Sequence, residues 1–245
     1  MKKENTMEPF DGKVALITGG SKGIGYGVAE ALLKLNMRVA ITSRSEKSAE
    51  EAAKKLTEIG RGKVLGIVAD VRNYESQAEA ARVVQEKWGQ LDVLVANAGI
   101  GHFGNVEDLS VEDWQETLDT NLSGVFYSIK AALPALKKSK GYIITISSLA
   151  GTNFFEGGAA YNASKFGVTG MTQAIMLDLR KYGINVSTIM PGSVATQFND
   201  HVPSDTDSWK IQKEDIGELV VNLLSMNPRT LPSKIEVRPS QPPSK

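Results

Sequence analysis

Short runs of β-branched and other apolar residues alternate along this chain with longer segments whose apolar residues have helical spacing. The alternation predicts seven strands and six main helices. The predicted strands are Lys13–Thr18, Arg38–Thr42, Lys63–Ala69, Leu91–Ala96, Tyr142–Ser147, Ile184–Met190 and Ile235–Val237. The predicted helices are Gly23–Leu35, Glu46–Ile59, Tyr74–Trp88, Val111–Leu136, Ala159–Lys181 and Lys213–Ser225, and Pro134 is expected to bend the fourth of them near its end.

Strands this apolar, each separated from the next by a helix, indicate a parallel sheet that is covered on both faces. The fold class is therefore α/β, a doubly wound Rossmann sheet of about seven strands. No break in composition divides residues 1–245, which we interpret as a single domain with a polar lead-in at 1–10 and a Pro-rich tail at 239–245. Ligands of such a sheet bind at the carboxyl ends of its strands.

The composition excludes several classes of function. The 28 basic and 28 acidic residues balance, so the chain has no electrostatic footprint for nucleic acid or an anionic membrane. The absence of cysteine excludes disulfides and thiolate catalysis, and the two histidines lack a ligand motif, so we expect no metal site. No apolar run reaches the ~18 residues of a membrane span, and the lead-in lacks the apolar core of a secretory signal. We expect a cytoplasmic protein with a small-molecule substrate.

A glycine-rich segment, Gly19–Gly25, directly follows the first predicted strand and opens the first helix. Glycines there let the backbone approach a phosphate, and the helix N-terminus attracts its charge. The alternative is a plain glycine-rich turn, but the position after the first strand favours phosphate binding. A literal G-x-G-x-x-G at Gly99–Gly104 is not followed by a helical pattern, so we interpret it as a flexible loop beside the site.

The end of the second predicted strand indicates which cofactor the chain prefers. An acidic residue there would bind both ribose hydroxyls and repel a 2′-phosphate, but residues 36–45 contain none. Arg44 stands there instead, with Lys22 in the glycine segment, and a guanidinium suits phosphate binding. The sequence therefore favours NADP(H) over NAD(H), the alternative being that Arg44 is a solvated surface charge.

Tyr161 and Lys165 are one helical turn apart, so their side chains share a face of the predicted helix. A nearby cation favours the phenolate and lowers the pKa of a tyrosine from about 10, which suits proton exchange with a carbonyl or alcohol oxygen. Ser148, at the end of the fifth predicted strand, is placed to hold the same oxygen. Each element alone also fits a packed ring, a solvated charge and a turn.

Asn121 falls in the apolar stripe of the fourth predicted helix, three residues after Leu118 and four before Val125, so it points inward. A buried amide must be hydrogen-bonded. It is either a structural asparagine or part of a site.

In combination these residues resemble the short-chain dehydrogenase/reductase family, and in particular its 3-oxoacyl-acyl-carrier-protein reductases and carbonyl reductases. The resemblance extends from about Lys13 to Phe198. The matching segments are Thr18–Gly25, Asp70-Val71, Asn97-Ala98-Gly99, Asn121, Ser148, Tyr161 with Lys165, and Pro191–Thr196.

The resemblance implies a role for each matching residue. Tyr161 is the general acid/base, Lys165 lowers its pKa and holds the nicotinamide ribose, Ser148 binds the substrate oxygen, and Asn121 anchors a water that links Lys165 to a proton path. The implied cofactor contacts are Gly19, Ser21, Gly23, Ile24 and Gly25 for the pyrophosphate, Asp70 and Val71 for the adenine, Asn97 for the adjacent ribose, and Pro191, Gly192, Val194 and Thr196 for the nicotinamide. Ser147 is expected to be structural.

The chain departs from the family at its end, where Leu231–Pro239 replaces the usual Asp-Gly-Gly run. This departure argues against acyl-carrier recognition and the usual tetramer contacts. Residues 197–212 are expected to cover the substrate, with an open cleft because they are short and polar. Four residues, Phe103, Phe154, Phe155 and Phe198, are either its apolar walls or core aromatics. The resemblance also implies a homodimer or homotetramer paired through the fourth and fifth predicted helices.

Three functions follow from these patterns. The first is an NADPH-dependent reductase of ketones or aldehydes with Tyr161 as general acid. The second is an NAD(P)-dependent alcohol or hydroxysteroid dehydrogenase that works in the oxidative direction. The third is an NADP-binding sensor without catalysis, against which the presence of both Ser148 and Tyr161 argues.

Overall fold

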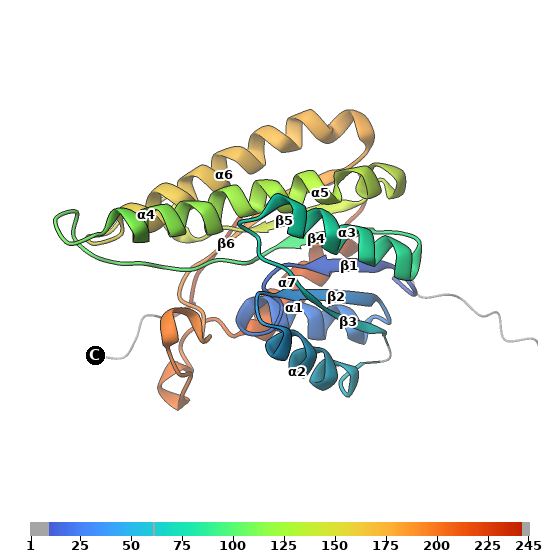
Figure 1. The fold of residues 1–245 in the computed structure, drawn as a ribbon, viewed down its shortest axis with the longest axis horizontal. Helices are drawn as coiled ribbons and strands as arrows, with labels where there is room; N and C mark the ends of the chain where they lie inside the picture. The colour runs from blue at the N-terminus through green and yellow to red at the C-terminus, as the bar shows by residue number, and fades with distance from the viewer. Residues whose placement is uncertain (1–9, 61, 242–245) are drawn as a thin grey trace, which may run out of the picture.

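A computed structural model describes residues 10–60 and 62–241, which form a seven-stranded parallel sheet between two layers of helices (Figure 1). The strands are β1 (Val14–Ile17), β2 (Arg38–Ser43), β3 (Val64–Val68), β4 (Val93–Ala96), β5 (Tyr142–Ile146), β6 (Asn185–Pro191) and β7 (Lys234–Val237). The helices are α1 (Gly23–Lys34), α2 (Glu46–Thr57), α3 (Tyr74–Trp88), α4 (Val111–Leu118), α5 (Gly124–Ser139), α6 (Ala159–Leu179) and α7 (Lys213–Ser225). The predicted fold class is confirmed.

The strand order is β3-β2-β1-β4-β5-β6-β7, and every neighbouring pair is parallel. The chain builds one half of the sheet outward from β1 and then crosses back to add β4 beside it. The loops after β1 and β4 therefore leave the sheet in opposite directions, which opens a crevice between them. The carboxyl ends of the central strands, and the residues that follow them, line this crevice.

Two apolar cores hold the helices against the sheet. One face carries α1, α2 and α7 and includes Leu32, Ile41 and Val220, and the other carries α3, α5 and α6 and includes Leu94, Ile129 and Val168. Figure 1 shows α4, α5 and α6 stacked along one side of the sheet and α1 and α2 along the other. β1, β4 and β5 are buried along their whole length, and except for Thr145 in β5 their side chains are apolar or aromatic.

The prediction of a single helix from Val111 to Leu136 is wrong, because a π-helical turn interrupts it. The structure has α4, then a π-helical turn over Asp119–Ser123, then α5, which continues past Pro134 to Ser139. A π-turn inserts one residue into the helical repeat and often marks a functional site. Asn121 lies in this turn.

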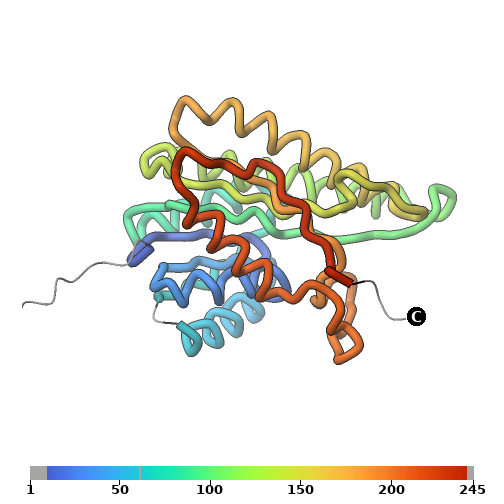
Figure 2. Tube along the Cα trace, turned by 180° about the vertical axis from the view of Figure 1, so that it is seen from behind, coloured from blue at the N-terminus to red at the C-terminus, as the bar shows by residue number. Residues whose placement is uncertain are grey.

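The last described residues lie beside the loop after β6. Gly192 donates its backbone N–H to the carbonyl of Val237 (2.8 Å), so the residues after β7 lie against the loop after β6. Figure 2 shows this C-terminal segment, in red, ending next to the orange segment that precedes α7. Most of the expected lead-in and the end of the expected tail, residues 1–9 and 242–245, lie outside the described residues.

Candidate active site

A cleft of about 470 Å³ lies at the carboxyl ends of the strands. It collects residues from the ends of β1, β2, β3, β4, β5 and β6. Of the residues predicted for the site, those that line it are Gly19, Ser21, Lys22, Gly23, Ile24, Arg44, Asp70, Val71, Asn97, Ser148, Tyr161, Lys165, Pro191, Gly192, Val194 and Thr196. Gly25 and Asn121, which were also predicted for the site, do not line the cleft and contact the residues that do.

The glycine-rich segment is shaped by close backbone approaches. Gly19 and Gly23 have φ of +64° and +57°, the left-handed region that favours glycine. Gly25 packs under the loop, where a Cβ would lie 2.5 Å from the amide nitrogen of Asn97. That amide donates to the carbonyls of Thr18 (2.9 Å) and Gly19 (3.1 Å), so Asn97 fixes the loop as well as lining the cleft.

The start of α1 is left open toward the cleft. Helices α2, α3 and α4 begin with side-chain caps from Ser45, Asn73 and Ser110, whereas α1 has no side-chain cap and no acidic residue in its first turn. Its first N–H groups therefore keep their capacity to bind an anion.

Two hydroxyls in the same cleft also lack partners. Thr42 Oγ1 and Thr120 Oγ1 are buried without a hydrogen bond to any described residue. Buried polar atoms are rarely left unpaired, so both indicate a polar ligand or water in the cleft. The open helix end, the close glycine backbone and these hydroxyls fit a nucleotide cofactor, and Gly19–Gly25 with the residues after β2 to β6 would hold it.

Tyr161, Ser148 and Lys165 meet at the inner end of the cleft. The Ser148 hydroxyl accepts from Ala150 N (3.1 Å) and lies within hydrogen-bonding reach of the Tyr161 phenol. Lys165 is 4% exposed, donates from Nζ to the carbonyl of Ile146 (3.1 Å) and lies 5.6 Å from the Tyr161 ring centre. Ser147 is engaged instead with the carbonyl of Lys165 and the hydroxyl of Thr169, as expected of a structural residue.

The net direction of the Tyr161 pKa is upward in the cofactor-free protein, which the helical spacing of Tyr161 and Lys165 does not predict. Burial raises the pKa of the Tyr161 phenol, and the hydrogen bond with Ser148 offsets this only in part. Burial also lowers the pKa of Lys165 from 10.5 to about 8. Spacing along a helix gives the distance between two groups and not the loss of hydration that both undergo, so the lowering effect of Lys165 on the phenol stays a prediction.

Asn121 is fully buried, and the protein satisfies its side chain. Its Oδ1 accepts from Ile100 N (2.8 Å), and its Nδ2 donates to the carbonyl of Ile100 (2.8 Å) and to Ser164 Oγ (3.1 Å). The predicted inward orientation is thus observed. The amide ties the π-turn to the loop after β4 and to the helix that carries Tyr161 and Lys165.

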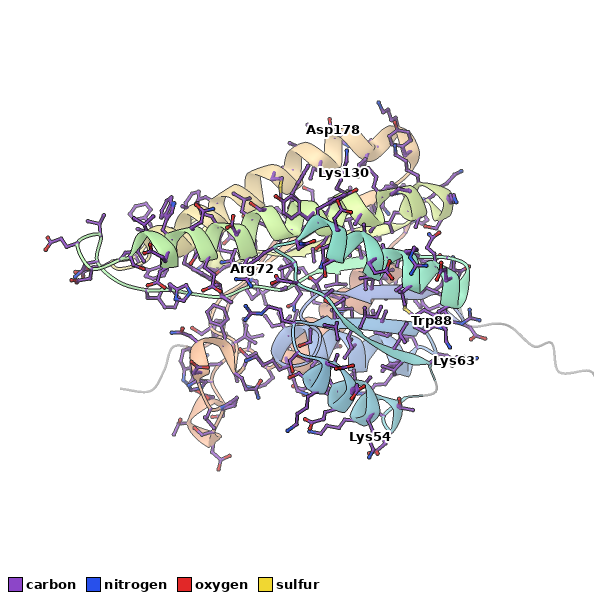
Figure 3. The ribbon with its side chains drawn as sticks, viewed as in Figure 1. Lys54, Lys63, Arg72, Trp88, Lys130 and Asp178 are labelled. Atoms are coloured by element: carbon purple, nitrogen blue, oxygen red, sulfur yellow. The ribbon has the colours of Figure 1, made fainter. Side chains whose placement is uncertain are left out.

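An ion-pair network at the outer end of the cleft was not predicted. Arg44 lines the cleft, but its Nη1 lies 3.7 Å from Glu116 on α4. Glu116 also pairs with Arg72 (3.1 Å) and His102 (3.0 Å), and the hydrogen bond from Arg72 lowers the pKa of Asp70. Arg72 lies between the start of α3 and α4 (Figure 3). Glu116 was missed because no motif in the sequence links α4 to the end of β2.

The four phenylalanines near the site are exposed rather than core residues. Phe103 and Phe198 pack on the Tyr161 ring, with centroids 5.4 and 5.8 Å away, and Phe155 packs on Phe103 at 5.9 Å. Phe154 is 87% exposed. The loop Gly99–Gly104 lies beside the site without opening a helix, as predicted, and Gly101 leaves room for the Phe103 and Phe198 rings.

The sequence profile described as short chain dehydrogenase matches residues 13–207 of this chain. The chain belongs to the short-chain dehydrogenase family. It is 39% identical to the trans-4-hydroxycyclohexanecarboxylate dehydrogenase of Sinomonas cyclohexanicum over 225 residues, which cover 87% of this chain and 86% of that protein.

Solved structures agree with this assignment. An alcohol dehydrogenase from the archaeon Thermococcus sibiricus, complexed with 5-hydroxy-NADP, has a TM-score of 0.89 and 30% identity over 96% of this chain and 100% of that one. A 3-ketoacyl-(acyl-carrier-protein) reductase from Brucella melitensis, complexed with NADH, has a TM-score of 0.84 and 26% identity over 94% and 98% of the two chains. The protein is therefore an NAD(P)-dependent oxidoreductase that acts on alcohol or carbonyl groups.

No three or more histidine, cysteine, aspartate or glutamate residues in 10–60 and 62–241 lie close enough together to hold a metal ion. In the same part of the chain, no helix combines the length and apolar character needed to cross a membrane.

The buried ammonium generates a prediction about stability. Lys165→Met is expected to raise the free energy of unfolding at pH 7 by about 1–3 kcal/mol, because burial disfavours the charged lysine in the folded state. The folded pKa of about 8 lies below the ordinary 10.5, so the unfolded chain binds more protons between these values. The free energy of unfolding of the wild type therefore rises as the pH increases from about 8 to 10.5. The difference in stability between Lys165→Met and the wild type becomes smaller over the same range.

Urea denaturation of the cofactor-free protein at pH 7 and pH 10 measures the effect. Lys54→Met, at an exposed site on the outer face of α2 (Figure 3), is the control and should show no such pH dependence. A Lys165→Met protein that is less stable than wild type at pH 7 would contradict the argument.

Proposed function

We propose that this protein reduces a ketone or aldehyde to an alcohol with NADPH, with Tyr161 as general acid. The observation that carries the proposal is the meeting of the Tyr161 phenol, the Ser148 hydroxyl and the buried Lys165 in a nucleotide-sized cleft. A phenol, a hydroxyl and a buried ammonium at one point of a cleft are the groups that proton exchange with a carbonyl or alcohol oxygen requires.

Each residue has one task in this proposal. Ser148 donates a hydrogen bond to the carbonyl oxygen, and Tyr161 gives that oxygen a proton. Lys165 stabilises the resulting phenolate by its charge, which it retains at pH 7 because its pKa is about 8. The bound nicotinamide supplies the hydride. Asn121 positions the helix of Tyr161 through Ser164, and the water assigned to Asn121 would link Lys165 to solvent.

The cofactor contacts follow the cleft. We assign the pyrophosphate to the glycine-rich segment and the open end of α1, the adenine to Asp70 and Val71, and the adjacent ribose to Asn97. Pro191–Thr196 would enclose the nicotinamide. Arg44 supports NADP because it lines the cleft after β2, where no acidic residue stands. Glu116 competes for its guanidinium, so a 2′-phosphate must displace that ion pair.

The reverse reaction, oxidation of an alcohol with NAD(P), is the second candidate. It uses the same residues with Tyr161 as general base. The relative with 39% identity is named a dehydrogenase of a hydroxy compound, and the Brucella melitensis structure holds NADH. Both observations favour this candidate over a sensor.

We also propose that the protein pairs through α6 and its neighbours. Five exposed positions of α6 recur at three- and four-residue spacing and are nonpolar, namely Ala163, Phe166, Gly170, Ala174 and Leu177, and the exposed Asp178 stands beside them near the end of the helix. Phe126 on α5 and Trp114 on α4 are also exposed. An apolar stripe on the outer helical layer is typical of a subunit interface.

Replacing the proposed acid tests the central assignment. Tyr161→Phe is expected to lower kcat/KM for carbonyl reduction by about 10³-fold, within the range of general acid catalysis, while NADPH still binds. Consumption of NADPH over a panel of ketones and aldehydes measures the first effect, and quenching of protein fluorescence measures the second. Tyr182→Phe, on the turn after α6, is the control and should match wild type.

Equal rates for Tyr161→Phe and wild type would overturn the role of Tyr161. A wild type that binds NADPH but turns over no substrate in either direction would favour the sensor.

The cofactor preference depends on Arg44. Arg44→Ala is expected to raise KM for NADPH about tenfold, because it removes a charged partner of the 2′-phosphate, and to change KM for NADH less than twofold. Steady-state kinetics with both cofactors measure the difference, with Arg82→Ala on α3 as control. Equal use of both cofactors by wild type, unchanged by Arg44→Ala, would contradict the NADP assignment.

The proposed interface depends on Phe166. Phe166→Glu is expected to convert the oligomer to monomers, since a carboxylate would be buried without a partner at its centre. Sedimentation velocity measures the mass, and Val106→Glu, at a loop position that is 82% exposed, should leave it unchanged. A wild type that sediments as a monomer at micromolar concentration would overturn the proposal.

A further inference from the structure

A second hollow of about 780 Å³ opens beside the cleft and shares Ser148 and Tyr161 with it. Aromatic side chains line much of this hollow: Phe154, Phe155, Phe198 and Trp209. They come from the segment before α6 and from residues 197–212, so two separate parts of the chain face each other across it. A molecule whose reacting oxygen lies at Ser148 and Tyr161 would therefore have its remaining body in this hollow.

Basic side chains, but no acidic ones, line the hollow among the described residues. Among the described residues that line it, the basic side chains are His201, Lys210 and Arg238, and no aspartate or glutamate is present. His201 and Lys210 are already engaged, because both lie 2.6 Å from the carboxylate of Asp207, which is buried behind them. Arg238 is thus the basic group with the most capacity for a further partner.

Arg238 is held at the hollow without being saturated. Its Nη2 lies 3.0 Å from Glu236, which is two residues earlier, in β7. No other polar contact of the guanidinium is found within the described residues, so Nε and Nη1 are left for a ligand. Backbone contact between Gly192 and Val237 fixes the preceding residue against the loop after β6.

Arg238 belongs to the segment that directly follows β7. The segment Leu231–Pro239 departs from the Asp-Gly-Gly run of the resembled family, and it is this segment that brings a guanidinium to the hollow. Figure 2 shows the last described residues, in red, beside the orange segment that precedes α7. The change therefore bears on substrate selection rather than on the shared chemistry at Tyr161.

We propose that the substrate is a carboxylic acid with an apolar, ring-sized body, whose ring lies against the aromatic side chains and whose carboxylate binds Arg238. This inference rests on the proposed function. The reacting carbonyl carbon gains a hydride from the cofactor and its oxygen gains a proton from Tyr161, and oxidation is the reverse. The carboxylate forms and breaks no covalent bond. A planar guanidinium binds a carboxylate through two parallel hydrogen bonds, which sets the distance of the carbonyl from the anchor.

Matched pairs of acids and esters test the proposal. The probes are 4-acetylbenzoate and 4-oxocyclohexanecarboxylate, each with its methyl ester, assayed in the wild-type enzyme with NADPH and with NADH. We expect kcat/KM to be about tenfold higher for each acid than for its ester. Arg238→Gln should remove this preference by raising KM for the acids with little change in kcat, because the anchor binds ground state and transition state alike.

Three comparisons separate an anchor from a structural role. Arg238→Lys should restore part of the preference, and Arg229→Gln, on the exposed turn before β7, should leave it unchanged. Raising NaCl from 50 to 500 mM should raise KM for the acids and not for the esters. Esters that react as well as acids in the wild type, or acids and esters equally impaired by Arg238→Gln, would overturn the inference.

Failure of the acid preference can be distinguished from failure of the proposed function. If neutral ketones are reduced and Tyr161→Phe abolishes that reduction, the proposed function stands even where the acid preference fails. If the wild type reduces no carbonyl compound and oxidises no alcohol, charged or neutral, both fail together.

Discussion

The site depends on a lysine ammonium that the fold keeps out of water. Lys165 projects from α6, is buried, and is fixed by its hydrogen bond to the last carbonyl of β5. An isolated buried charge destabilises a protein unless it is paired, and here the protein supplies a carbonyl dipole rather than a carboxylate. An acidic partner would hold the lysine as an inert ion pair. Within residues 10–60 and 62–241 no acidic partner is found, so the positive charge is available to the phenol one turn earlier.

The surrounding strands and helices bring the other groups of the site next to Lys165. The sheet places the ends of β4, β5 and β6 side by side, so that Ser148 comes from one strand end, Pro191 and Gly192 from the next, and Tyr161 from the helix between them. Asn121 then joins the π-turn, the loop after β4 and α6 through three hydrogen bonds of 2.8–3.1 Å. A regular helix from α4 to α5 would change the direction of that amide, because one residue fewer would shift it around the helix axis.

Much of this could be predicted from the sequence, because continuous apolar strands and helical spacing identify a parallel sheet, and the glycine segment and Tyr161 with Lys165 are local motifs. Three features could not be predicted from the sequence. The π-turn at Asn121 results from packing across three elements, and the apolar stripe contains no sign of it. The ion pair of Glu116 with Arg44 joins residues far apart in the chain. The raised pKa of Tyr161 results from burial, which spacing along a helix does not report.

The most direct test is the titration of Tyr161 itself. Carbon-13 labelling of the tyrosine ring and NMR between pH 6 and 11 would give the pKa of this phenol in the wild type and in Lys165→Met, each with and without NADP. The account predicts a pKa above 10 in the cofactor-free wild type and a still higher one in Lys165→Met. Saturation with NADP should lower the pKa in the wild type far more than in the variant. A Tyr161 pKa that is the same in the two proteins, under both conditions, would contradict the claim that the buried ammonium controls the phenol.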